Sequence, residues 1–314
     1  MLFSIIIPAY KRHFLADAIE SVISQTFIDW ELIIVDDCSP EQLEEVVAPY
    51  LTDNRIRYKR NEHNYGAKRL AENWNNCLTY CRGQYVICMG DDDMLTPNSL
   101  EEYTHMIQKF PSTNVIHGQT EIIDENGEVT ELMEPRFEHE SALQLIYYRW
   151  VGSGRQQFIG DFCYKKDSLL KSGGFFNLPL AWGSDDITAV IAATDNGIAN
   201  TQKICFLYRK NRYSISSDRN NKLKAEVLLL QEQWYTHYIE RYRPNGADEQ
   251  IALRLLRDML NPHFLCHICF LVEKDLKIDK RNILFWLKNR KRFSLSINKI
   301  ILQFIKSFKK SNNE

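Results

Sequence analysis

Residues 85–97, YVICMGDDDMLTP, join an apolar segment long enough for one buried strand to three consecutive aspartates, Asp91, Asp92 and Asp93. Neighbouring carboxylates repel one another, so a fold that holds them close normally supplies a cation or a protonated partner. A polar loop that caps the next helix, with Pro97 in its first turn, needs only one of them. The run therefore predicts a functional site at the end of a buried strand.

The first 110 residues alternate between apolar runs and segments with helical spacing. Ser39 and Pro40 predict the start of one helix, as its cap and first turn. Strands are expected at 2–7, 31–37, 55–61 and 83–89, and helices at 14–25, 39–51, 66–82 and 97–110. This alternation predicts a parallel sheet that is covered by helices on both faces.

Polar or conformationally special residues follow three of these strands. They are Pro8-Ala9-Tyr10, Asp36-Asp37 and the aspartates 91–93. Ligands of such sheets bind beyond the carboxyl ends of the strands, so the three segments are expected to converge at one edge.

After residue 111 the pattern is less regular. A hairpin is predicted around Asn126-Gly127, and a helix is predicted to open with Ser184, Asp185 and Asp186 and to end at Gly197. A strand–helix unit is expected at 157–175, a last strand at 200–211, and helices from about 219 onward.

Charge is unevenly distributed. The net charge of −2 argues against a general nucleic-acid binder, yet residues 280–310 hold ten Lys or Arg and no Asp or Glu. Ile, Leu, Phe and Trp alternate with these bases, which favours a helix lying in an anionic membrane surface. A packed helix pair with a solvated basic face, or a partner-binding segment, is the alternative.

The protein is expected to be cytoplasmic. A peripheral position at the inner face of the cell membrane is a further expectation. The N-terminal apolar run resembles no secretory signal, and no segment approaches the roughly 20 apolar residues of a membrane span. The eight cysteines lie mostly within apolar patterns, as reduced core residues do.

The chemistry suggested by the strand ends is a transfer reaction. Glycine-rich dinucleotide and P-loop motifs are missing from the sequence. Two of the three aspartates could hold Mg²⁺ or Mn²⁺ through oxygen ligands and leave room for a diphosphate, whose departure the metal would assist. A carboxylate elsewhere, Asp185 or Asp186, could be the general base.

Two segments resemble family 2 glycosyltransferases of the GT-A fold. They are FSIIIPAYKRHFLADAIESVISQTFIDWELIIVDDCSP (3–40) and NEHNYGAKRLAENWNNCLTYCRGQYVICMGDDDMLTP (61–97). The resemblance is dense over 2–110 and looser over 155–217. It implies an α/β, mainly parallel mixed sheet flanked by helices, followed by a helical extension.

The resemblance also implies roles for individual residues. Asp37 would read the pyrimidine edge of the nucleotide, and Asp36 would support its turn. Asp92 would be the first metal ligand, with Asp93 and Asp91 in the same DXD region. Asp91 would then contact the ribose or sugar. The other implied donor contacts are Pro8, Ala9, Tyr10, Asn64, Gly66, Lys68, Arg209, Arg212 and Ser214.

Three positions depart from the family pattern. Gly90 stands where D-x-D-D has its first aspartate, which leaves the register of the metal motif open by one residue. Asn73-Trp74-Asn75 replaces A-R-N. Ser184-Asp185-Asp186 replaces the commoner Glu-Asp pair, so both acids stay candidates for the base, with Asp185 preferred.

The expected protein is an inverting glycosyltransferase that moves a sugar from a nucleotide diphosphate, UDP by preference, to a saccharide or lipid-linked acceptor in bacterial polysaccharide or glycolipid synthesis. Self-association stays open. A nucleotidyltransferase and a non-catalytic, membrane-docked nucleotide-sugar scaffold are the alternatives. The expected organisation is a GT-A domain over 1–218, with a nucleotide-binding half (1–110) and an acceptor-side half (111–218), and a helical extension over 219–314.

Overall fold

The computed structural model describes residues 1–152, 154–212 and 220–308. Two compact units make up the chain, a first unit of Met1–Tyr213 and a second unit of Ser214–Glu314. This division lies close to the boundary expected at residue 218. The functional division at residue 110 stays a prediction.

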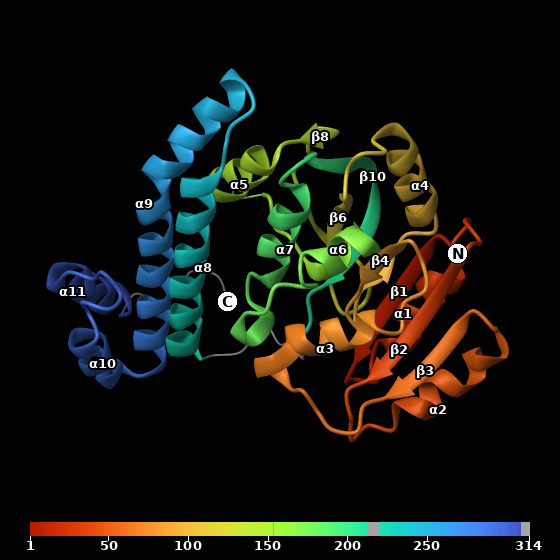
Figure 1. The fold of residues 1–314 in the computed structure, drawn as a ribbon. Helices are drawn as coiled ribbons and strands as arrows, with labels where there is room; N and C mark the ends of the chain where they lie inside the picture. Colours follow the sequence, from red (N-terminus) through yellow and green to blue (C-terminus); the bar gives the residue numbers. More distant parts are fainter. Residues whose placement is uncertain (153, 213–219, 309–314) are drawn as a thin grey trace. The chain divides into compact units, whose positions relative to one another are not determined.

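The strands of the first unit belong to one sheet. They are β1 (Phe3–Ala9), β2 (Trp30–Asp36), β3 (Ile56–Arg60), β4 (Tyr85–Cys88), β5 (Met94–Leu95), β6 (Val115–Ile123), β7 (Val129–Leu132), β8 (His139–Glu140), β9 (Phe162–Lys165) and β10 (Ile198–Arg209). Within the described residues their order is β3-β2-β1-β4-β9-β6-β10-β5, with β7 beside β6 and β8 beside β10. Figure 1 shows β3, β2, β1 and β4 side by side in this order.

Most of the long strands share one direction. β1 is parallel to β2 and β4, β2 to β3, and β6 to β10. β9 runs antiparallel between β4 and β6, which keeps β4 and β6 aligned with each other. The mixed, mainly parallel sheet confirms the expected fold class.

Helices cover the sheet of the first unit. They are α1 (Leu15–Ile23), α2 (Leu43–Val47), α3 (Leu70–Leu78), α4 (Ser99–Lys109), α5 (Ala142–Val151), α6 (Lys166–Lys171) and α7 (Ser184–Ala193), with 3₁₀ turns η1 (Ala48–Thr52), η2 (Ala67–Arg69), η3 (Ile159–Asp161) and η4 (Pro179–Ala181). β1 and β2 are almost wholly buried, and α1 packs Leu15, Ile19 and Val22 into the same core. Fully burying one such side chain contributes about 1.5–3 kcal/mol.

The predicted start of α2 was wrong. The helix begins at Leu43, after Gln42 in a left-handed conformation, rather than at Ser39. Ser39 is engaged elsewhere, because its Oγ donates to the carbonyl of Tyr10 at 2.5 Å and its amide donates to Asp36 Oδ1 at 2.7 Å. It joins the ends of β1 and β2 instead of capping a helix.

Most other elements follow the expectations. The hairpin of β6 and β7 turns at Gly127, which has φ of 86°, and α7 opens at Ser184 as predicted. The short strands β5 and β8 and the helix α5 were not predicted.

The second unit is helical, as expected. It contains α8 (Asn221–Arg241), α9 (Ala247–Ile278), η6 (Lys280–Asn282), α10 (Ile283–Lys288) and α11 (Ile297–Lys306). α8 packs along α9, and α11 packs against α9 and α10. Among the described helices, none is both long enough and apolar enough to span a bilayer.

Candidate active site

The ends of β1, β2 and β4 meet at one edge of the sheet, as predicted. The amide of Asp37, just after β2, donates to the carbonyl of Ala9 at 2.8 Å. Asp91, just after β4, accepts from the amides of Tyr10 and Lys11, both at 2.7 Å to Oδ2. Three segments distant in sequence are thereby tied together around a group of carboxylates.

Asp37 is buried and held by the turn predicted near the nucleotide. Its carboxylate accepts from the Asn61 side chain at 2.9 Å and from the amides of Tyr65 and Gly66 at 3.0–3.2 Å. Asn64 closes the turn by donating to the Asp37 carbonyl at 2.7 Å. Gly66 has φ of 67°, a conformation that glycine adopts without strain.

The Asn73-Trp74-Asn75 segment connects this turn to the rest of the first unit. Asn73 Oδ1 accepts from the Asn61 amide at 3.0 Å and so helps to orient the group that contacts Asp37. Asn75 bonds both backbone polar groups of Phe175, at 2.7 and 2.8 Å. The segment that lacks the family's arginine therefore has a positioning role on both sides of α3.

Asp36 is fully buried beneath the same turn. Its carboxylate accepts from the Tyr58 hydroxyl at 2.6 Å and forms an ion pair with Arg60. Burial, together with the hydrogen bond to Asp36, raises the pKa of Tyr58. These contacts of Asp36 are with protein groups, and its supporting role stays a prediction.

The three aspartates after β4 have different surroundings. Asp91 and Asp93 are buried, and Asp93 Oδ1 accepts from the Arg209 amide at 3.0 Å. Asp92 is only partly buried, and its Oδ2 accepts from the Asn211 side chain at 2.7 Å. Burial and the charge of Asp92 raise the pKa of Asp91 to about 6, and the same two causes raise that of Asp93.

This donor set suits a hard divalent cation. Carboxylate oxygens are the ligands that Mg²⁺ and Mn²⁺ prefer, and a cation would offset both causes of the raised pKa values, the burial of these carboxylates and their mutual repulsion. Gly90 makes the close arrangement feasible, because a Cβ there would lie 2.8 Å from Asp93 Oδ2 and 2.9 Å from Asp92 Oδ1. Among the described residues, no group of three or more His, Cys, Asp or Glu side chains is placed to hold a metal ion, so a cation here would need further ligands from the substrate.

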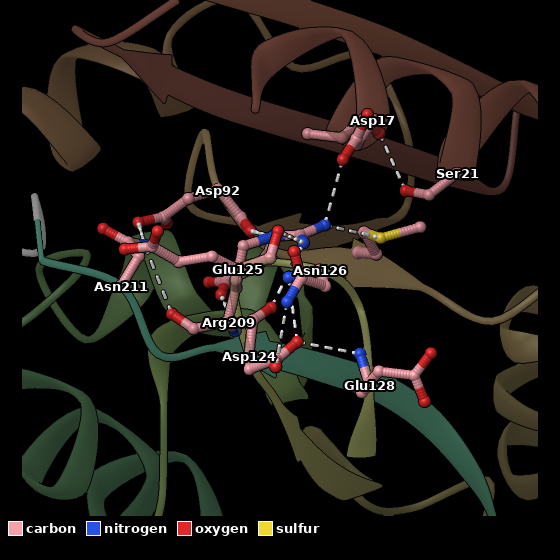
Figure 2. Close-up of polar contacts among 12 residues, drawn as sticks. Asp17, Ser21, Asp92, Asp124, Glu125, Asn126, Glu128, Arg209 and Asn211 are labelled. Carbon is pink, nitrogen blue, oxygen red and sulfur yellow. Dashed lines mark hydrogen bonds and ion pairs between the residues drawn. The ribbon is translucent and has the colours of Figure 1, made fainter. Parts of the chain in front are cut away.

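Arg209, which was expected near the diphosphate, has a guanidinium that is held by protein groups. Figure 2 shows its guanidinium between Asp17 and the β6–β7 turn. It pairs with Asp17 at 3.1 Å and donates to the carbonyls of Asp92 at 2.9 Å and of Asp124 and Glu125 at 3.3 Å. Because its donors face these protein acceptors, we interpret Arg209 as a clamp that fixes the aspartate loop.

Replacing Arg209 with methionine is expected to destabilise the first unit by about 3 kcal/mol, because partly buried carbonyls lose a charged donor and the ion pair with Asp17 is lost. The melting temperature should fall by about 6–12 °C. Arg212→Met is the control, since that side chain is 73% exposed beside Glu125. If the melting temperature were unchanged and nucleotide binding were lost, Arg209 would instead be assigned the predicted contact with the diphosphate.

Three other residues predicted to contact the donor, Pro8, Lys68 and Arg212, lie within the described part of the chain. Pro8 lies within β1, and Lys68 is an exposed residue of η2. Arg212 is paired with Glu125 at 3.9 Å. Ser214 lies outside the described residues.

The two candidate bases at the start of α7 are distinguished by Arg149 of α5. Its guanidinium pairs with Asp186 at 3.1 Å. Burial, followed by the charge of Asp186, raises the pKa of Asp185 to about 7, although Arg149 opposes this shift. Asp185 thus has a proton affinity suited to accepting a proton near neutral pH.

The segment that leads into α7 lies beside the nucleotide turn. η4 packs against η2 and α3, and η2 directly follows the Gly66 turn.

Sequence reasoning missed three residues that contact the aspartates of the site, Asn61, Arg149 and Asn211. Asn211 had a signal, because it stands between Arg209 and Arg212, which were both expected to contact the donor.

Solved structures of other proteins share this fold. Staphylococcus aureus TarS 1–349 matches with a TM-score of 0.63 at 17% identity, covering 98% of this chain and 90% of that one. The mannosyltransferase PcManGT of Pyrobaculum calidifontis, solved with GDP-Man and Mn²⁺, matches with a TM-score of 0.56 at 12% identity, covering 97% and 86%. At these identities the likeness establishes the fold.

Sequence comparison establishes the family. The chain is 29% identical over 232 residues to UDP-Glc:alpha-D-GlcNAc-diphosphoundecaprenol beta-1,3-glucosyltransferase WfgD of Escherichia coli, covering 73% of this chain and 85% of that protein. The sequence model described as Glycosyl transferase family 2 matches residues 4–173, more than half of the 314 residues. With the expected fold and the motifs in their expected order, the chain belongs to glycosyl transferase family 2.

Proposed function

We propose that this glycosyltransferase moves a hexosyl group from a UDP-sugar to a hydroxyl of a saccharide or lipid-linked acceptor, with inversion, in the synthesis of a bacterial surface polysaccharide or glycolipid. The observation that carries the proposal is the joining of three strand ends by Asp37 and Asp91. The similarity to WfgD, whose name specifies a UDP-Glc donor and a lipid-diphosphate acceptor, supports these substrate classes. A lipid-linked acceptor would place the enzyme at a membrane surface.

Asp37 is the residue proposed to select the base. A carboxylate offers about four acceptor positions, and three donors from Asn61, Tyr65 and Gly66 fix its orientation. The remaining capacity suits the N3–H of uracil, which cytosine lacks at that position. Pro8, Ala9 and Tyr10 would flank the base from the end of β1.

Asp92 is proposed as the principal ligand of Mn²⁺ or Mg²⁺, with Asp91 and Asp93 beside it. When bound, such a cation neutralises the charge that develops on the departing diphosphate. Among the described contacts, Asp91 and Asp93 accept from backbone amides, whereas the recorded partner of Asp92 is the Asn211 side chain. Asp92 can therefore turn toward a ligand at the smallest structural cost.

Asp185 is proposed as the general base. It would take the proton of the acceptor hydroxyl while the hydroxyl oxygen bonds to the anomeric carbon and the bond from that carbon to UDP breaks. Asp186 would hold Arg149 and, by its charge, keep the pKa of Asp185 near neutrality. Single displacement of this kind inverts the anomeric configuration.

The rate should follow the ionisation of Asp185. Because the pKa of this carboxyl is raised to about 7, the base is protonated at lower pH and activity is lost below pH 7 rather than below pH 4. We expect kcat/KM for the acceptor, at saturating donor and metal, to rise about tenfold per pH unit up to pH 7 and then level off. Arg149→Met should move the midpoint upward, and a profile flat from pH 5 to 8 would exclude Asp185.

The proposal is tested by calorimetric titration of the full chain with UDP and GDP, each with and without Mn²⁺, followed by a screen of UDP-sugars for turnover. Metal-dependent binding of UDP and weak binding of GDP are expected. Binding of GDP alone would preserve the enzyme class and refute the donor. No observation among the described residues favours the nucleotidyltransferase or the non-catalytic scaffold.

A further inference from the structure

The last described helix, α11, directs its most apolar side outward. Toward α9 and α10 it buries Ile300 and the polar Gln303. Apart from Leu302 and the half-buried Phe304, its other large apolar side chains, together with Phe308 just beyond its end, recur at helical spacing and are 45–63% exposed. This α11 stripe consists of Ile297, Ile301, Ile305 and Phe308.

The orientation of α11 is fixed by contacts within the second unit. Lys280 donates to the carbonyl and hydroxyl oxygens of the buried Ser307, at 2.8 and 2.7 Å. Its ammonium also lies 4.4 Å from the ring centroid of Phe308. Rotating the helix to hide the stripe would break these bonds and expose Ile300, so the stripe faces outward within this unit.

The segment that carries the stripe is basic, and two of its lysines, Lys299 and Lys306, lie near Cys269 of α9. Residues 280–308 contain no Asp or Glu. Arg281 pairs with Asp279, and Arg292 with Glu226. In the part of the chain that the structure describes, no ion pair is recorded for Lys288, Arg290, Lys291, Lys299 and Lys306.

We propose that the α11 stripe docks onto an anionic lipid bilayer, with Ile301 and Ile305 entering the interfacial layer and the basic residues meeting the headgroups. Negative headgroups over an apolar layer match both features of this surface. A second copy of the chain would match the apolar stripe but would bring an equally basic surface against it, which repulsion opposes. This inference goes beyond the glycosyl transfer reaction.

The test is co-sedimentation of the full chain with vesicles of phosphatidylcholine alone or mixed with phosphatidylglycerol. Wild type should bind the anionic vesicles and be released by salt. Replacing two exposed stripe residues, in Ile301→Asp/Ile305→Asp, should lower the partition coefficient at least about tenfold. Lys299→Glu/Lys306→Glu should lower it on anionic vesicles only.

A matched control is Val129→Asp/Leu132→Asp, which makes the same change at an exposed apolar pair of β7 in the first unit. It should bind vesicles as wild type does, and all variants should melt close to wild type because the replaced side chains are exposed, apart from the half-buried Lys299. Equal binding by Ile301→Asp/Ile305→Asp, or no binding of anionic vesicles by wild type, would overturn the proposal. A dimer that this variant dissociates, measured by light scattering, would also overturn it and assign the stripe to self-association. The vesicle assay uses neither donor nor acceptor, so its outcome is separate from that of the proposed function.

Discussion

Asp92→Asn is expected to abolish the Mn²⁺-dependent part of UDP binding and to lower kcat by about 10²–10³. Asparagine keeps the size of the side chain and an oxygen for Asn211, but it removes the charge that would hold the cation. Asp92 is also the least buried of the three aspartates, so its replacement disturbs the fold least. Titration of UDP with and without Mn²⁺, together with initial rates, measures both effects.

The control for this substitution is Asp195→Asn, which makes the same chemical change at an exposed residue after α7. It should bind UDP and turn over as wild type does. If Asp92→Asn kept metal-dependent binding and Asp91→Asn lost it, the metal ligand would be one position earlier, which is the register that Gly90 leaves open.

Asp185→Asn is expected to lower kcat by about 10²–10⁴ without weakening UDP binding. The amide cannot accept the acceptor proton, whereas the donor site at Asp37 and Asp92 is unchanged. Steady-state kinetics and titration of UDP separate the two quantities. The residual rate should also lose the pH midpoint near 7.

Asp186→Asn is the matched comparison. It removes the ion pair with Arg149 and the neighbouring charge that raises the pKa of Asp185. We expect a loss of less than about tenfold and a pH midpoint below 7, since the proton acceptor itself is retained. A larger loss for Asp186→Asn than for Asp185→Asn would exchange the two roles.

The order of elements could be predicted because a parallel sheet buries its strands on both faces. Such strands are continuous apolar runs, and β1, β2 and β4 were found where these runs occur. The secondary-structure predictions that failed relied on local sequence signals, and tertiary contacts override such signals. Ser39 has the chemistry of a helix cap, but the carbonyl of Tyr10 competes for its hydroxyl. β5 and β8 span two residues each and exist only because β10 pairs with them.

By itself the sequence determined that carboxylates stand at the ends of buried strands, since the apolar runs of β2 and β4 are each followed by aspartates. The tertiary structure alone decided their tasks. We interpret Arg209 as a clamp because Asp17, 192 residues away, pairs with its guanidinium, and Asp185 and Asp186 differ because Arg149 of α5 forms an ion pair with Asp186. The sequence identifies which residues can carry a charge. Their pKa values and the hydrogen-bond donors still available to a ligand depend on neighbours that only folding brings within a few ångströms.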